Sequence, residues 1–103
     1  MTYVVVTTTF GNIKDAKRIG KSIINKELGA CFQIVGPIES IYSWNDEVEV
    51  SEEYLCFIKT KEDLYEEIEE LLIEVHPYDT PEIIVTEIKD GSEEYLDWID
   101  HVT

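Results

Sequence analysis

The chain contains several short runs that are apolar at every position instead of at every second one. Side chains along a β-strand point alternately to the two faces of a sheet. A run that is apolar at odd and even positions alike therefore predicts a strand that is buried on both faces. Such runs lie at residues 3–6, 54–58 and 83–85, and residues 31–35 nearly form a fourth. A sheet built from them needs a covering layer on each side.

Four strands and two sharp changes of direction are predicted from these runs and the residues between them. Gly36-Pro37 interrupts the second strand, and we expect a bulge or a bend there because proline cannot donate to a strand ladder. Asn45-Asp46 is expected to form a two-residue turn, since both residues tolerate positive φ. The predicted strands cover residues 3–8, 31–35 continued by 38–44, 47–59 and 82–88.

Apolar residues at helical spacing separate the strands and predict three helices. The first helix is expected to begin after Asn12 as its cap and to end at Gly29 in the left-handed conformation. Thr60 is expected to cap the second helix, which carries an apolar stripe up to residue 75. Ser92 is expected to start a short helix near the end of the sequence.

The resulting order is βαββαβ followed by a last helix. It predicts an α+β fold, a ferredoxin-like split βαβ sandwich with two helices on one face of an antiparallel sheet. Residues 1–103 are expected to form a single domain. One short helix is too small to cover the other face, so we expect further copies of the chain there. The apolar hairpin at residues 38–53 is expected to dock on a neighbouring subunit and close a ring.

The formal net charge is −15, from 23 acidic and 8 basic residues. Nucleic acids and anionic membranes require a basic face, so neither is an expected partner. Cations are the expected small partners, although an acidic surface also serves solubility alone. No apolar run approaches the ~20 residues of a membrane span, and no signal-like segment precedes the first strand. We therefore expect a cytoplasmic protein in which Cys31 and Cys56 are free thiols.

A rigid corner is predicted between the second helix and the last strand. Two prolines bracket a tyrosine in His76-Pro77-Tyr78-Asp79-Thr80-Pro81-Glu82, and each restricts the residue before it to extended backbone. We interpret His76 as a metal ligand, because neutral imidazole suits copper and zinc. The alternative is a histidine that only terminates a helix, where the helix dipole and the last carbonyls favour it.

Aromatic and charged residues near this corner predict a cleft between subunits. Its predicted lining is Tyr42, Trp44, Lys59, Tyr78 and Glu82. Lys59 is expected to pair with Glu82, or to bind an anion at the start of the second helix. The aromatic residues are equally explained as anchors of a subunit interface.

Cys31 is a further candidate metal ligand. The register predicted from the turn at residues 45–46 places it on the same face as Cys56, roughly 13 Å away at ~3.3 Å per residue, and a bulge at Gly36-Pro37 would shift this register. At that distance the two thiols do not share an ion. Both are also explained as small buried hydrophobes.

Motifs along nearly the whole chain resemble the CutA divalent-cation tolerance proteins in their order and spacing. The matching segments are Ala30-Cys31, Ser40-Ile41-Tyr42-Ser43-Trp44, Ile58-Lys59-Thr60, His76-Pro77-Tyr78, Pro81-Glu82-Ile83 and Tyr95-Leu96-Asp97-Trp98-Ile99. The resemblance implies a cytosolic homotrimer of ferredoxin-like subunits around a threefold axis. It also implies a role in metal tolerance, with copper as the usual divalent cation.

Two functions from different classes are compatible with the sequence. The first is a trimeric, non-catalytic protein that binds or responds to a divalent metal such as copper or zinc, which the fold itself does not require. The alternative is a trimeric small-molecule sensor similar to the PII-type signalling proteins, with its ligand between subunits. An enzyme is not expected, because the sequence has no nucleophile–base pair, glycine-rich phosphate loop or zinc signature.

Overall fold

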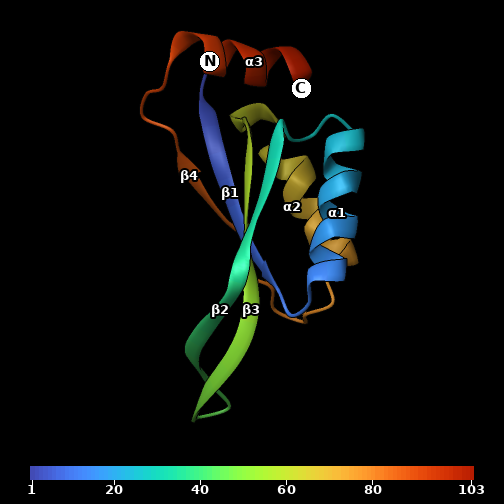
Figure 1. Ribbon diagram of the computed structural model, residues 1–103, viewed down its shortest axis with the longest axis vertical. Helices are drawn as coiled ribbons and strands as arrows, with labels where there is room; N and C mark the ends of the chain where they lie inside the picture. The colour runs from blue at the N-terminus through green and yellow to red at the C-terminus, as the bar shows by residue number, and fades with distance from the viewer.

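The computed structural model describes residues 1–103 and contains four strands and three α-helices (Figure 1). The elements are, in chain order, β1 (Tyr3–Phe10), α1 (Ile13–Asn25), β2 (Cys31–Trp44), β3 (Glu47–Lys61), a 3-10 turn (Glu62–Leu64), α2 (Tyr65–Val75), β4 (Ile84–Glu87) and α3 (Glu93–Val102). This is the predicted βαββαβ order with a terminal helix, and it confirms the α+β class. None of the helices has the length and apolar character needed to cross a membrane.

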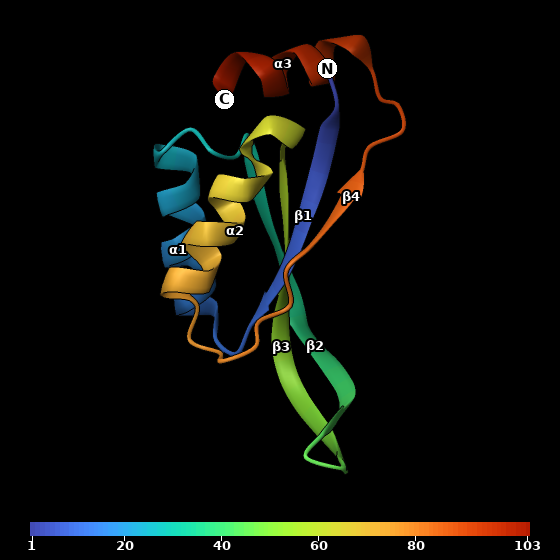
Figure 2. The same cartoon turned by 180° about the vertical axis from the view of Figure 1, so that it is seen from behind.

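The four strands form one antiparallel sheet in the order β2-β3-β1-β4. Helices α1 and α2 lie side by side on one face of this sheet (Figures 1 and 2). Burial alternates along β1, where Val4 and Val6 are buried and Val5 is partly exposed. The hydrophobic core between sheet and helices consists of Val4, Val6, Phe10, Ala16, Ile19, Ile23, Leu28, Cys56, Ile58, Ile68 and Leu72.

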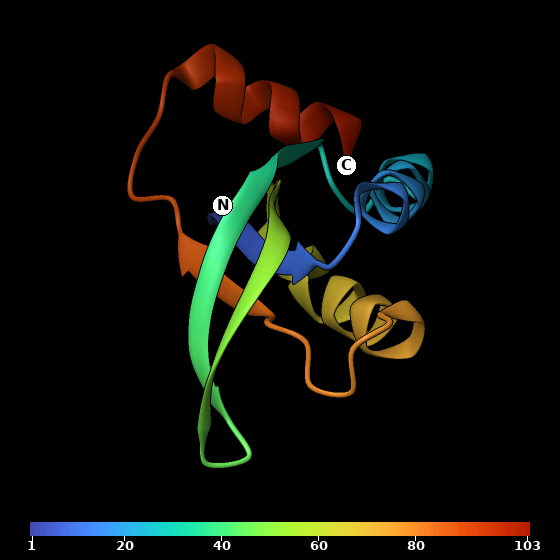
Figure 3. The same cartoon turned by 60° about the horizontal axis from the view of Figure 1, so that its bottom comes forward.

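The face opposite α1 and α2 is only partly covered within one chain. Helix α3 lies across one end of the sheet, and the β2–β3 hairpin projects beyond the helices at the other end (Figures 1 and 3). The hairpin makes the molecule elongated, with extents of 45 × 25 × 22 Å. On the uncovered face, Val35 and Ile84 are 49% and 52% exposed. Large apolar side chains are also exposed on the hairpin, namely Ile41, Tyr42, Trp44, Val48 and Val50.

The hairpin has both of the predicted irregularities. Asn45 and Asp46 form the turn with φ of 51° and 63°, which confirms that both residues take the left-handed conformation. The register shifts at Gly36-Pro37, between Val35 and Ile38, as the interruption of the strand predicted. The two halves of β2 therefore remain one strand with a bulge.

The bulge changes the placement of the two cysteines. Cys56 pairs with Ile34, whereas Cys31 pairs with Lys59, three residues farther along β3 than Cys56. An odd separation along a strand reverses the direction of the side chain. Cys31 and Cys56 therefore lie on opposite faces of the sheet, and the expectation of a shared face was wrong.

The helix ends agree with the predicted caps at two positions and differ at a third. The side chains of Asn12 and Ser92 each accept a hydrogen bond from the backbone N–H three residues farther on, as expected of helix caps. Gly29 is not the left-handed residue after α1, because Glu27 takes that conformation with φ of 57°. Gly29 is instead needed for close packing, since a Cβ there would lie 2.8 Å from Cγ2 of Ile58.

Strand β3 is longer, and β4 shorter, than the sequence predicted. Thr60 lies inside β3, fully buried, where its hydroxyl donates to the carbonyl of Leu28 at 2.6 Å. Thr60 is therefore not a helix cap, and Leu64 before α2 makes no side-chain cap bond either. β4 is limited to Ile84–Glu87, the four residues that pair with β1.

Candidate functional site

His76 follows α2 and is the first residue of the corner formed by residues 76–82, and its side chain is buried. Its Nε2 lies 2.7 Å from the carbonyl oxygen of Thr9, and the backbone N–H of Tyr78 donates to its Nδ1 at 3.1 Å. This pattern requires a neutral ring that is protonated on Nε2. The imidazole also stacks on Phe10, with ring centroids 4.4 Å apart and an interplanar angle of 8°. His76 thus ties the corner to the end of β1.

The same contacts leave His76 no free lone pair for a metal ion. Nε2 carries the proton donated to Thr9, and the lone pair of Nδ1 accepts from Tyr78. Burial lowers the pKa of His76, although the hydrogen bond to the Thr9 carbonyl opposes this change. Coordination by His76 would first require opening of the corner. The geometry is that of a structural histidine after a helix, but its ring is neutral and its carbonyl partner is Thr9 of β1, not one of the last carbonyls of α2.

Tyr78 connects the corner to β3. Its hydroxyl donates to Oε2 of Glu53 at 2.9 Å, and its ring lies tilted against His76 with centroids 4.9 Å apart. Glu53 is only 8% exposed, so this bond provides a partner for a carboxylate that water barely reaches. Burial, followed by the bond to Glu53, raises the pKa of Tyr78. The phenol therefore stays protonated and acts as the donor at neutral pH.

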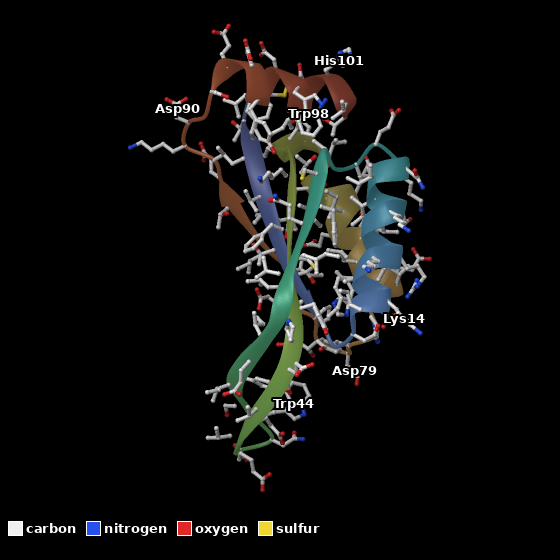
Figure 4. The ribbon with its side chains drawn as sticks, in the orientation of Figure 1. Lys14, Trp44, Asp79, Asp90, Trp98 and His101 are labelled. Carbon is white, nitrogen blue, oxygen red and sulfur yellow. The ribbon has the colours of Figure 1, made fainter.

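A groove of about 770 Å³ opens between the corner and the projecting hairpin. The end of β1, the outer halves of β2 and β3, and residues 78–82 form its walls. Its lining residues are Thr9, Ser40, Ile41, Tyr42, Trp44, Glu49, Ser51, Glu53, Tyr78, Asp79, Thr80 and Glu82. Figure 4 shows Trp44 near the tip of the hairpin and Asp79 at the corner. Four of the lining side chains are carboxylates, and none is Lys, Arg or His.

The groove brings together four of the five residues predicted to line a cleft. They are Tyr42, Trp44, Tyr78 and Glu82. The hydroxyls of Tyr42 and Ser51 are hydrogen-bonded at 2.7 Å, which fixes one wall. Whether a second subunit closes this groove stays a prediction.

Lys59 is the exception, because it lies beside α3 near the opposite end of the sheet. Its Nζ is 5.4 Å from the ring centroid of Tyr95, and it pairs within the sheet with Val5 and Cys31. Within one chain, the expected ion pair of Lys59 with Glu82 is absent. The expected anion site was also wrong, because β3 continues past Lys59 and no helix begins there.

Sequence reasoning missed three carboxylates of the groove, those of Glu49, Glu53 and Asp79. The hairpin register could have indicated Glu49, since a two-residue turn at residues 45–46 places it opposite Tyr42, as observed. No comparable signal connects Glu53 to Tyr78, because these residues are 25 positions apart and meet only in the folded chain.

The residues present do not form a resident metal centre within one chain. No group of three or more His, Cys, Asp and Glu is close enough to hold a metal ion. Both cysteines are free thiols, and burial raises the pKa of Cys56 to about 12, which keeps it protonated at neutral pH. His101 is exposed on α3 and points away from the sheet (Figure 4). The groove instead offers oxygen donors, which suit hard cations.

Three comparisons connect this architecture with known proteins. Residues 4–102 match the family described as CutA1 divalent ion tolerance protein. The protein CutA, chloroplastic, of Arabidopsis thaliana is 39% identical over 100 residues, which are 97% of this chain and 55% of that protein. The divalent-cation tolerance protein CutA of Thermus thermophilus is 37% identical over 95 residues, 92% of both chains. This chain thus spans little more than half of the plant relative and nearly all of the bacterial one.

The fold agrees closely with a solved structure of the same family. The crystal structure of CutA1 from Oryza sativa superposes with a TM-score of 0.97 at 40% sequence identity. The superposition covers 100% of this chain and 94% of that one. The projecting hairpin and the terminal helix are therefore part of a shared architecture.

Proposed function

The chain belongs to the CutA1 divalent ion tolerance protein family, and from this membership we propose that it binds divalent cations reversibly, without catalysis, in the groove beside the hairpin. The observation that carries the proposal is the charge of that groove. Its twelve lining residues include four carboxylates and no cationic side chain. A cation in the groove is attracted from several sides, whereas an anion is repelled.

The composition of the groove supports weak, exchangeable binding instead of a resident metal. Its potential ligands are the carboxylates of Glu49, Glu53, Asp79 and Glu82, together with several hydroxyl groups, but no three of the carboxylates are close enough within one chain to hold one ion. For a given donor set, affinity among first-row divalent metals rises from Mn²⁺ to Cu²⁺ and falls again at Zn²⁺. Copper and zinc, the metals expected from the sequence, are therefore suitable probes, with Cu²⁺ binding more tightly.

Titration calorimetry with Cu²⁺ at pH 7 tests the proposed site. We expect the double substitution Glu49→Gln with Asp79→Asn to weaken binding about tenfold, because each change removes a charged ligand. The matched control, Glu66→Gln with Glu70→Gln, makes the same change of net charge on α2, outside the groove. If both pairs of substitutions weakened Cu²⁺ binding equally, net charge alone would explain the loss of affinity. That result would contradict a site in the groove.

The substitution His76→Gln distinguishes the groove from the histidine predicted as a metal ligand. If the groove binds the metal, the variant keeps its affinity for Cu²⁺, and binding persists down to about pH 5, where most carboxylates are still ionised. Loss of binding in His76→Gln, together with wild-type binding that is already lost well above pH 5, would assign the metal to the imidazole after opening of the corner.

We further propose that the chain functions as a homotrimer. Exposed apolar side chains on the hairpin support association, since Ile41, Val48 and Val50 are 66%, 78% and 58% exposed. The number three is what the family resemblance implies. Light scattering at ~0.15 M salt is expected to give three times the mass of the 11.9 kDa chain, and the mass of one chain would contradict the proposal. A cytoplasmic location stays a prediction.

The size and aromatic lining of the groove favour a second candidate function, a small-molecule sensor. A volume of about 770 Å³ lies within the range of ~300–1,000 Å³ found for ligand pockets. Tyr42 and Trp44 offer aromatic faces to a cationic organic ligand. A thermal-shift screen with polyamines and quaternary amines is expected to raise the Tm of the wild type but not that of Glu49→Gln with Asp79→Asn. No shift with any of these compounds would count against a sensor.

A further inference from the structure

Helix α1 and the residue after it carry most of the positive charge of the molecule. The chain has 8 basic residues, and the five in this region are Lys14, Lys17, Arg18, Lys21 and Lys26. All five are exposed, and Figure 4 shows Lys14 at the start of α1 pointing away from the sheet. They form what we call the basic strip, on a protein whose net charge is −15.

Most of the basic strip has no acidic partner. The structure contains two ion pairs, Arg18 with Asp15 at 3.1 Å and Lys61 with Asp100 at 3.4 Å. The four lysines of the strip are therefore unpaired, although the chain contains 23 acidic residues. Their charges remain available to a ligand.

The stability of α1 does not account for the basic strip. Lys17 and Lys21 are four residues apart on one face of the helix and repel each other. Lys14 lies in the first turn, next to the positive end of the helix dipole, where a cation is unfavourable. These positions of Lys14, Lys17 and Lys21 destabilise the helix when no ligand is bound. Such a loss of stability is expected of residues that serve to bind a partner of opposite charge.

An apolar groove of about 430 Å³ lies between α1 and β2, within the basic strip. Ile24, Phe32 and Ile34 make its apolar surface, and Lys17 and Lys21 contribute to its lining. The groove therefore combines a surface for one bulky apolar group with two flanking positive charges.

Gly20 maintains the shape of this groove. A Cβ at this position would lie 2.6 Å from Cδ1 of Phe32, so the absence of a side chain lets the ring pack against the helix backbone. Glycine inside a helix is unfavourable relative to alanine. The groove is thus another feature that α1 keeps at the expense of its own stability.

We propose that this groove, with the basic strip, binds an acidic peptide segment of a partner protein. One bulky apolar side chain of the segment packs on Ile24, Phe32 and Ile34, and its carboxylates pair with Lys17 and Lys21. From residue 14 to residue 26 the strip extends about 18 Å at ~1.5 Å per residue. Roughly five to six residues of an extended peptide, at ~3.3 Å each, match this length.

Other anionic partners fit the surface less well. A nucleic-acid duplex keeps its bases stacked inside and offers no bulky apolar group to fill the groove, and an anionic bilayer presents a broad surface that the acidic remainder of the molecule repels. A short peptide avoids this repulsion at ~0.15 M salt, where charges more than ~8 Å away are largely screened. Attraction of the peptide to the nearby lysines then exceeds its repulsion by the distant acidic residues.

Fluorescence anisotropy at ~0.15 M salt tests the proposal, using a labelled hexapeptide of five glutamates and one internal phenylalanine. We expect the full chain to bind this peptide and Lys21→Glu to bind it at least about tenfold more weakly, because a charged hydrogen bond is replaced by repulsion. Lys89→Glu is the matched control, since it makes the same charge change at an exposed lysine outside α1. Its affinity for the peptide is expected to remain within twofold of the wild type.

Two further measurements locate the contact. Replacing the phenylalanine of the peptide by alanine is expected to weaken binding, and amide NMR shifts are expected to concentrate around Gly20 and Phe32. The proposal would be overturned if Lys89→Glu weakened peptide binding as much as Lys21→Glu, or if the NMR shifts were confined to other elements. Tighter binding of phosphatidylglycerol vesicles or single-stranded DNA than of the peptide would also overturn it. The groove shares no lining residue with the carboxylate-lined groove, so a negative result here leaves the metal titration unaffected.

Discussion

At the scale of single residues, the imidazole of His76 explains how the proline-bracketed corner is held. It donates to Thr9, accepts from Tyr78 and stacks on Phe10, so one neutral ring joins α2, the corner and β1. Coordinating a metal through either ring nitrogen would cost at least one of these hydrogen bonds. The divalent-cation binding that we propose is therefore better supported at carboxylates, which keep unused lone pairs.

The protonation state of His76 makes stability depend on pH. Burial lowers its pKa in the folded protein below the ordinary value of about 6.5. Its contribution to the free energy of unfolding is therefore complete above pH 7 and decreases as the pH falls, because the unfolded chain binds the proton first. Urea unfolding at equal protein concentration should show that the unfolding free energy decreases more from pH 7.5 to 5.5 in the wild type than in His76→Gln. Parallel losses in both proteins would contradict this linkage.

Removing the hydroxyl of Tyr78 tests the bond to Glu53. Tyr78→Phe leaves a nearly buried carboxylate without its donor, and we expect a loss of about 1–3 kcal/mol in unfolding free energy. Tyr42→Phe removes the same group from an exposed bond to Ser51, and we expect at most about 0.5 kcal/mol there. Chemical denaturation of the two variants gives the comparison. Equal effects would show that burial of Glu53 is unimportant.

At the scale of elements, the connection from α1 to β2 shows how close packing replaces a familiar cap. Glycine after a helix usually supplies a left-handed residue. Here the chain turns at Glu27, two residues earlier, and Gly29 instead provides space beneath Ile58 and Ile23. The backbone of Ala30 then donates to the carbonyl of Lys59 at 2.8 Å and leads the chain into β2.

The two positions should respond in opposite directions to substitution. Glu27→Gly is expected to raise unfolding free energy by about 0.5–1 kcal/mol, because relief of left-handed strain exceeds the entropy that glycine adds to the unfolded chain. Gly29→Ala is expected to lower it by about 1–3 kcal/mol, since the new methyl would approach Ile58 within 2.8 Å. Thermal unfolding of both variants measures these two changes in stability. A stable Gly29→Ala would show that the packing there can yield.

At the scale of the whole molecule, charge and apolar surface oppose each other. Each chain has a net charge of −15, yet it exposes apolar side chains along the hairpin and on the uncovered sheet face. Burying these surfaces against neighbours favours the proposed trimer, while bringing the charges together disfavours it. The basic strip on α1 and the carboxylate-lined groove show that the charge is also unevenly distributed.

Assembly should therefore strengthen with salt. Between ~0.01 M and ~0.15 M salt the screening length falls from about 30 to about 8 Å, which weakens repulsion between acidic subunits and leaves apolar burial intact. Sedimentation velocity at fixed protein concentration is expected to show more of the assembled form at the higher salt. More dissociation at the higher salt would indicate that ion pairs, not apolar surface, hold the subunits together.

Features set by neighbouring residues could be predicted from the sequence. The Asn45-Asp46 turn, the bulge at Gly36-Pro37 and the caps at Asn12 and Ser92 depend on backbone preferences and contacts within a few positions, and all appear in the structure. The element order followed from apolar periodicity. The ends of β3 and β4 did not, because strand length depends on the pairing partner.

The amino-acid sequence by itself determined the α+β class, the order of elements, the hairpin turn and an excess of acid that favours cations. Only the tertiary structure decided that His76 has both nitrogens occupied, that Glu53 meets Tyr78, and that Lys59 lies far from the corner. It also decided that the cysteines face opposite ways. The reason is that local preferences act along the chain, whereas these contacts join distant residues, and one bulge reverses every side chain that follows it.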